Sequence, residues 1–153
     1  MRTRFRIFLC VVLFSLLVVL QTQTFAAELK IHKRVLNNGL QVFVIENHTV
    51  PLVTIEITVK NGAYTEPPEY DGLSHLYEHM FFKGNAVIPN QEKYLERQRE
   101  LGMVWNGTTS EERVNYFVTL PKNNLKEGLI FMRDAVETPL FDQTELEKER
   151  EVV

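Results

Sequence analysis

The sequence predicts a domain of mixed α and β structure, because two different hydrophobic periodicities occur along its 153 residues. Residues 52–60 alternate apolar and polar side chains, as a strand does, whereas residues 124–137 repeat apolar side chains every three to four positions, as a helix does. Hydrophobic residues make up 44% and charged residues 24% of the chain, which excludes a disordered or fibrous protein. The net charge of −3 offers no basic surface to nucleic acid, and a single cysteine excludes a disulfide framework.

The first 26 residues have the three-part layout of a secretory signal peptide. Three arginines precede an apolar run over residues 7–20, and a polar segment then leads to small residues, with cleavage expected after Ala26. The apolar run is short for a bilayer span, but an uncleaved N-terminal membrane anchor stays open as the alternative. We therefore expect a domain over residues 27–153 that is exported to a bacterial periplasm or secreted, and that touches a membrane only through an uncleaved signal.

The first half of this domain is expected to combine strands with two helices. A hairpin over residues 35–46 turns at Asn37, Asn38 and Gly39, and a strand with one wetter face follows over residues 52–60. After two breaks, one helix is expected over residues 72–83, closed by Gly84. A second helix is expected to begin at the N-cap Asn90 and to be closed by Gly102.

The second half is expected to contain one strand and two further helices. Residues 114–120, rich in β-branched and aromatic side chains, form the strand. The helix that follows ends before Pro139, and its buried stripe is expected to consist of Leu125, Leu129, Met132 and Val136. Asp142 and Glu145 have the pattern of a capping box, and the helix that they begin is expected to continue to Val153. Because no stop signal follows, we expect the chain to be a fragment.

Three residues of the helix expected over 72–83 have the types and spacing of a metal-dependent hydrolytic site. At 100° per residue, His75, Glu78 and His79 fall within one arc of about 100°. The apolar side chains of this helix fall on the opposite side and comprise Leu73, Leu76, Tyr77 and Met80. Two imidazoles at this spacing can bind one zinc ion, and the carboxylate between them can accept the proton of an attacking water. The alternative is a pair of surface histidines beside a solvated glutamate.

The sequence around these residues resembles a known family of zinc metallopeptidases. Residues 75–79 are the inverted His-x-x-Glu-His motif of the inverzincins, and residues 59–84 look like the pitrilysin or insulinase-like family, M16. Residues 106–116 are similar to that family's Asn-Ala-aromatic-Thr-Ser segment and the strand after it, and residues 149–153 to the start of its Glu-Arg-x-x-Val segment. The resemblance extends over residues 35–153 and rests on three motifs in the family's order.

The resemblance implies an α+β fold, in which a mostly antiparallel sheet carries helices packed on one face. It implies that the chain is the N-terminal part of a catalytic domain that is truncated at the C-terminus. It also implies that His75 and His79 bind Zn²⁺, with a third ligand expected just beyond Val153, at about position 155 or 156. Glu78 would be the catalytic base, and Glu149 matches a family glutamate that supports the site without touching the metal.

The segment formed by Asn106, Gly107, Thr108 and Thr109 has two interpretations. The residues alone permit a hairpin turn at Asn106 and Gly107. Family position instead implies an edge strand to which a substrate peptide adds as a further strand, and we favour this interpretation. Gly107 stands where the family usually has alanine, which loosens the strand, and Trp105 stands where small residues are common.

These implications together predict an exported zinc endopeptidase that hydrolyses peptides or unfolded protein segments. Its partners would be that substrate and, in a homodimer or heterodimer, a related subunit, with no nucleic acid. The fragment alone is expected to be inactive, since it lacks the third ligand. The alternative is a non-catalytic peptide-binding or scaffolding subunit of the same family, although such members typically lack an intact His-x-x-Glu-His motif.

Overall fold

The computed structural model describes residues 29–153. These residues belong to two compact units, and the boundary between the units in the sequence lies between His48 and Thr49. The predicted signal peptide lies outside the described residues. The described part of the first unit is an antiparallel hairpin of strands β1 (Ile31–Val35) and β2 (Gln41–Ile45). The predicted hairpin turn is confirmed, but the first strand ends at Val35 instead of beginning there. Within residues 29–153, no helix has the length and apolar character that crossing a membrane requires.

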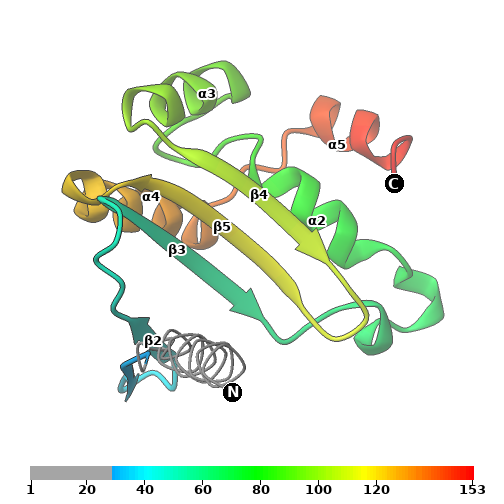
Figure 1. Ribbon diagram of the computed structural model, residues 1–153. Coiled ribbons are helices and arrows are strands. Elements are labelled where there is room, and N and C mark those ends of the chain that lie inside the picture. Colours follow the sequence, from blue (N-terminus) through cyan, green and yellow to red (C-terminus); the bar gives the residue numbers. More distant parts are fainter. Residues whose placement is uncertain (1–28) are drawn as a thin grey trace, which may run out of the picture. The chain divides into compact units, whose positions relative to one another are not determined.

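The second unit contains a three-stranded antiparallel sheet in the order β3-β5-β4 (Figure 1). Its strands are β3 (Leu52–Val59), β4 (Val104–Thr109) and β5 (Val114–Pro121). The central strand β5 places Tyr116 opposite Ile57 of β3 and Gly107 of β4. The two strands predicted at residues 52–60 and 114–120 are therefore confirmed. Residues 106–109 form an edge strand and not a turn, since the chain reverses after them, where the Ser110 N–H donates to the Arg113 carbonyl at 2.9 Å.

The second unit also contains four α-helices and three short 3₁₀ turns. The helices are α2 (Leu73–Phe81), α3 (Gln91–Glu100), α4 (Leu125–Glu137) and α5 (Gln143–Arg150). The 3₁₀ turns are η1 (Ala63–Thr65), η2 (Pro68–Tyr70) and η3 (Lys122–Asn124). Figure 1 shows α2 and α4 on one face of the sheet, with α2 beside the edge strand β4. The fold is thus α+β with helices packed on one face of an antiparallel sheet, as expected.

The hydrophobic core lies between that face of the sheet and the helices. Strand β5 alternates strictly, and its four inward side chains are at most 3% exposed; they are Val114, Tyr116, Val118 and Leu120. The Phe81 ring of α2 stacks on the Tyr116 ring with 4.0 Å between their centroids. Burial of these side chains is the main force that holds α2 against the sheet.

The buried face of α4 differs from the predicted stripe. Gly128, Phe131, Met132 and Ala135 are buried, whereas Leu125, Leu129 and Val136 are 40–50% exposed. Gly128 explains this rotation, because a Cβ there would lie 2.7 Å from Leu120 Cδ1. The missing side chain brings the helix close to the sheet on a face that a count of apolar residues does not find.

The helix boundaries follow the predicted N-caps more closely than the predicted ends. The side chains of Asn90 and Asp142 accept hydrogen bonds from backbone N–H groups three residues later, at 2.9 and 3.0 Å, which confirms both caps. However, α2 ends at Phe81, two residues before the expected stop, and α5 ends at Arg150 instead of continuing to Val153. Gly84 does not cap α2 directly; it permits the close turn after the helix, since a Cβ there would lie 2.9 Å from the Ile88 carbonyl oxygen.

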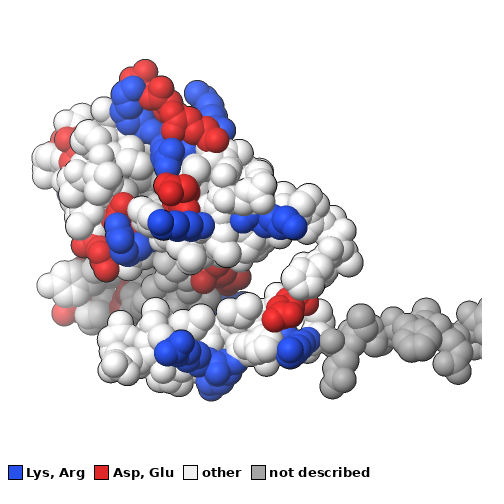
Figure 2. All heavy atoms as spheres, turned by 90° about the vertical axis from the view of Figure 1, so that its left-hand side faces the viewer, with Lys and Arg blue, Asp and Glu red and all other residues white. Residues whose placement is uncertain are grey.

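Acidic and basic side chains are interspersed on the face shown in Figure 2. Helix α3 contributes ion pairs along its exposed side, including Lys93 with Glu96 at 2.6 Å and Arg97 with Glu100 at 3.0 Å. Arg97 also reaches Glu127 of α4 at 2.9 Å, so one guanidinium connects the two helices.

Candidate active site

A carboxylate from the preceding loop holds the beginning of α2. The helix starts after Gly72, which has a φ of +89° and no side chain that can act as a cap. Glu66 supplies the acceptors instead, because its carboxylate accepts the N–H groups of Gly72 at 2.8 Å and Ser74 at 2.5 Å. The Ser74 hydroxyl and these two N–H groups lower the pKa of Glu66, an effect that partial burial opposes.

The same loop is joined to the turn between β4 and β5. The N–H groups of Ala63 and Tyr64 donate to the carbonyl oxygens of Ser110 at 3.3 Å and Glu111 at 2.9 Å. Gly62 makes this close approach feasible, since a Cβ there would lie 2.2 Å from the Ser110 carbonyl oxygen. Its φ of −179° is ordinary extended backbone, so the glycine is required for space and not for conformation. The loop that caps α2 is thereby fixed to the sheet.

His75 and His79 converge on one point at the surface of α2. Their Nε2 atoms are 3.2 Å apart, and their rings are nearly perpendicular, at 87°. Two nitrogen ligands at about 2.05 Å from a tetrahedral zinc ion would be about 3.3 Å apart. The pair therefore fits two positions of a zinc site, and the predicted common face of the two histidines is confirmed.

Glu149 of α5 determines which nitrogen of His79 is available. The distance between His79 Nδ1 and Glu149 Oε2 is 2.7 Å. An ionised carboxylate can only accept, so Nδ1 donates, and a neutral imidazole then has its lone pair on Nε2, the atom that lies 3.2 Å from His75 Nε2. Lys83, 2.6 Å from the other oxygen of Glu149, and His79 together lower the pKa of that carboxyl.

Lys83 is part of this arrangement although sequence reasoning missed it. Its side chain is 16% exposed and also lies 3.5 Å from Glu145 of α5. The signal was present in the sequence, because residues 75, 79 and 83 are spaced four apart. Glu66 had a weaker signal, an acidic residue shortly before a helix whose N-cap is glycine.

Glu78 faces the edge strand β4. The hydroxyl of Thr109 donates to Glu78 Oε2 at 2.5 Å. A Cβ at Gly107 would lie 2.7 Å from Glu78 Oε1, so the bare backbone of the strand gives this carboxylate its space. Glu78 is half-buried, whereas His75 is exposed. The three residues of the motif therefore lie on one side of α2, as the helical spacing predicts.

The four residues predicted to bind substrate divide between the two faces of β4. Gly107 and Thr109 are half-buried on the side of α2, whereas Asn106 and Thr108 are exposed on the alternate positions. The Asn106 side chain accepts its neighbour's backbone N–H at 3.0 Å. Trp105 packs on Phe82 with 4.2 Å between ring centroids, so it belongs to the core on the helical side.

The described residues alone do not complete a metal site. Among residues 29–153, no group of three or more His, Cys, Asp or Glu side chains is arranged to hold a metal ion. The histidine pair offers two nitrogen donors to such a site. The chemistry and spacing of the donors nevertheless fit zinc, as shown by the distance between the two Nε2 atoms.

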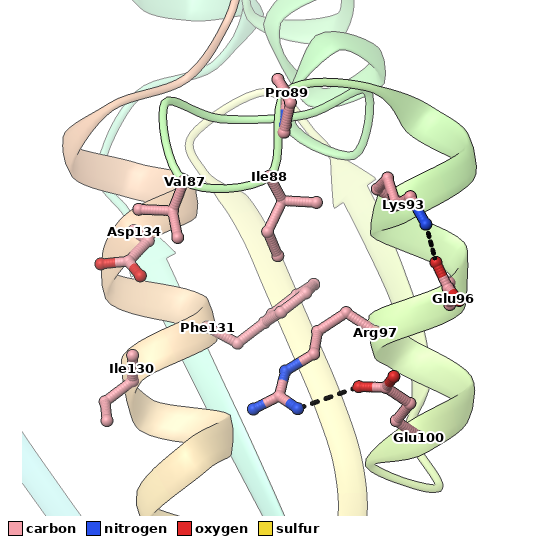
Figure 3. A pocket seen from close by; sticks show the side chains of 10 residues that line it. All are labelled: Val87, Ile88, Pro89, Lys93, Glu96, Arg97, Glu100, Ile130, Phe131 and Asp134. Carbon is pink, nitrogen blue, oxygen red and sulfur yellow. Dashed lines mark hydrogen bonds and ion pairs between the residues drawn. The ribbon is translucent and has the colours of Figure 1, made fainter.

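A separate cavity of about 350 Å³ lies between α3, α4 and the turn that precedes α3 (Figure 3). Ile88 and Phe131 point toward each other inside it, and charged side chains of α3 form its rim. None of the residues that line the cavity belongs to the His-x-x-Glu-His motif or to β4. The cavity is thus not part of the candidate active site.

The fold and the site together define a class: an α+β domain in which one helix presents two converging histidines and a carboxylate beside an edge strand. Residues 41–153 match the family model of insulinase, peptidase family M16. The chain therefore belongs to peptidase family M16.

Individual relatives agree with this assignment. The chain is 34% identical over 116 residues to the uncharacterized zinc protease YmxG of Bacillus subtilis, which covers 76% of this chain and 28% of that protein. It is 32% identical over 117 residues to human insulin-degrading enzyme, covering 76% of this chain and 11% of the enzyme. The crystal structure of a protease from Helicobacter pylori superposes with a TM-score of 0.75 at 25% identity, covering 81% of this chain and 30% of that one. The chain thus spans less than a third of the length of each of these proteins.

Proposed function

We propose that this chain belongs to an exported zinc endopeptidase and contributes two zinc ligands and the catalytic base. The observation that carries the proposal is the convergence of His75 and His79, whose Nε2 atoms are 3.2 Å apart on the same side of α2 as Glu78. Membership of family M16 supports the same chemistry. Export rests on residues 1–26, which the structure does not describe.

In this proposal, His75 and His79 hold Zn²⁺ together with a third residue beyond Val153. Bound zinc lowers the pKa of a water ligand to about 7 and polarises the carbonyl group of a substrate. Glu149 keeps a proton of His79 on Nδ1, which leaves Nε2 as the nitrogen that can bind the metal. Lys83 keeps Glu149 ionised by its contact with the second carboxylate oxygen.

Glu78 accepts the proton of the attacking water in this proposal. Thr109 occupies Oε2 with a hydrogen bond, which leaves Oε1 to take the proton. The protonated acid can later give that proton to the amine that leaves. A carboxylate on the same side of the helix as the metal ligands is suitably placed for both transfers.

The substrate class that we propose is a peptide or an unfolded protein segment. Among residues 29–153, strand β4 pairs only with β5, so its other edge offers backbone N–H and C=O groups to an extended chain. One relative is named for the degradation of insulin, which is a peptide. Backbone pairing recognises an extended chain largely without regard to its side chains.

The test compares Glu78→Gln with Glu147→Gln, a substitution at an exposed position of α5, in the full-length protein. Glu78→Gln should reduce kcat for a fluorogenic peptide by at least about 10³-fold while the protein retains its zinc, because only the base is lost. Glu147→Gln should leave both activity and zinc content unchanged. Cleavage by Glu78→Gln at the wild-type rate would show that the assignment of Glu78 as the base is wrong. Retention of zinc by His75→Ala would show that the assignment of His75 as a zinc ligand is wrong.

A further inference from the structure

The side of β4 that faces α2 is half-buried and makes contact with Glu78. Gly107 and Thr109 are two residues apart on this strand, so both lie on the same face. One of them is next to each oxygen of the Glu78 carboxylate. Residues assigned to substrate binding by their position in the family therefore have a different neighbour in the structure.

Thr109 holds one carboxylate oxygen in a defined place. Its hydroxyl donates to Glu78 Oε2 at 2.5 Å. The χ1 angle of a threonine on a strand is restricted, so the strand holds the hydroxyl in one rotamer. The terminal torsion of a glutamate is otherwise broad, and this hydrogen bond selects one orientation of the carboxylate plane.

Gly107 provides the space in which this orientation exists. A Cβ at residue 107 would lie 2.7 Å from Oε1, 2.8 Å from Cγ and 3.0 Å from Cδ of Glu78. Gly107 is not among the glycines with positive φ, so it is not required by the backbone conformation. Its contribution is the close approach between the strand and the glutamate side chain.

We infer that Thr109 is a positioning residue for Glu78, whose hydroxyl fixes the carboxylate in the orientation in which Oε1 accepts the proton of the water, and that the Thr109 side chain does not bind substrate. This inference rests on the proposed role of Glu78 as the base. Removing the hydroxyl leaves the carboxylate in place but free to rotate, so the chemical step slows while the binding of peptide and metal is retained.

The experiment uses Thr109→Val, which keeps the side-chain shape and loses the hydroxyl, in the full-length protein. We expect kcat to fall about 10- to 100-fold with KM and zinc affinity within about twofold of wild type. Thr109→Ser, which restores a hydroxyl, should recover most of the lost kcat. Thr58→Val is the matched control, because the hydroxyl of Thr58, on strand β3, also donates to a glutamate, Glu56, at 3.2 Å. This control substitution should leave kcat unchanged.

A second measurement does not depend on turnover. In the Glu78→Gln background, which binds peptide without cleaving it, adding Thr109→Val should leave the Kd of a fluorescent peptide unchanged. A raised Kd or KM would overturn the inference and show that the Thr109 side chain binds substrate. An unchanged kcat in Thr109→Val would show that the Thr109 hydroxyl has no role in the reaction. Loss of zinc from Thr109→Val would overturn it in favour of a structural role. Failure of the proposed function is a different result, namely full activity of Glu78→Gln itself.

Discussion

Replacing Glu66 by glutamine tests whether a loop carboxylate holds the helix that carries His75, Glu78 and His79. Glutamine keeps the length of the side chain, but one oxygen becomes an NH₂ group that cannot accept a hydrogen bond. Of the two N–H groups bound by Glu66, those of Gly72 and Ser74, at least one then loses its acceptor. The beginning of α2 should therefore open more often.

The expected size of this effect follows from the contacts that are lost. A hydrogen bond to a charged group contributes about 1.5–3 kcal/mol, and a helix N-cap typically about 1 kcal/mol. Glu66 is only half-buried, so solvent replaces part of the lost interaction. We expect the free energy of local opening of α2 to fall by about 1–2 kcal/mol, which corresponds to exchange about 5- to 30-fold faster.

Amide hydrogen exchange of residues 73–81, measured in the full-length protein, checks this expectation. Glu69→Gln, at an exposed position of the same loop, is the control and should leave exchange unchanged. Equal protection of α2 in Glu66→Gln and wild type at neutral pH would refute the capping role.

The pH dependence of the same measurement has a defined sign. The Ser74 hydroxyl and the two N–H groups hold the pKa of Glu66 below the ordinary value of 4.5 in the folded protein. A carboxyl whose folded pKa is depressed stabilises the fold above its unfolded pKa, and that contribution is lost as pH falls through the folded pKa. The difference between wild type and Glu66→Gln should therefore be full at pH 7 and shrink below pH 4.5. A difference that persists unchanged in acid would contradict the charge-based explanation.

Two further substitutions test the supports on either side of the site. Gly62→Ala should destabilise the loop before α2 by about 2–3 kcal/mol, because its Cβ would meet the Ser110 carbonyl oxygen at 2.2 Å and break the two backbone hydrogen bonds between this loop and the turn after β4. Unchanged protection of residues 61–66 in hydrogen exchange would argue against this expectation. Glu149→Gln should weaken zinc binding about 10- to 100-fold, because the amide loses the ion pair with Lys83 and no longer fixes the His79 tautomer. Competition with a chromophoric chelator measures this affinity. A zinc affinity equal to that of wild type would show that Glu149 does not support the metal site.

The sequence predicted those features that depend on local periodicity. The alternation of β3, the side chains at the N-caps of α3 and α5, and the common side of His75, Glu78 and His79 all follow from spacings of a few residues. Family position resolved the ambiguous segment 106–109 as a strand, because a turn signal of two residues cannot by itself be told from a flexible strand.

The features that the sequence did not predict depend on contacts between distant segments. The buried face of α4 is set by Gly128, because the absence of a side chain there lets the helix approach the sheet. A glycine contributes nothing to a hydrophobic pattern, so the pattern did not predict this face. Thr109 was assigned to substrate because the family places peptide on this strand, yet its hydroxyl bonds a helix residue 31 positions away. Lys83 carried a signal at helical spacing, but its partner Glu149 is brought close only by the docking of α5.

The accuracy of this site has to come from outside α2, because a nine-residue helix is too short to be stable by itself. Three different segments hold the N-terminus of α2 and two of its functional side chains: Glu66 at the N-terminus, Thr109 of β4 at Glu78, and Glu149 of α5 at His79. These three contacts share no residue, so substitutions that remove them should affect helix protection, kcat and zinc affinity separately. A variant of one contact that altered all three quantities together would show that α2 moves as a single loosely held body, and the independent supports inferred here would then not exist.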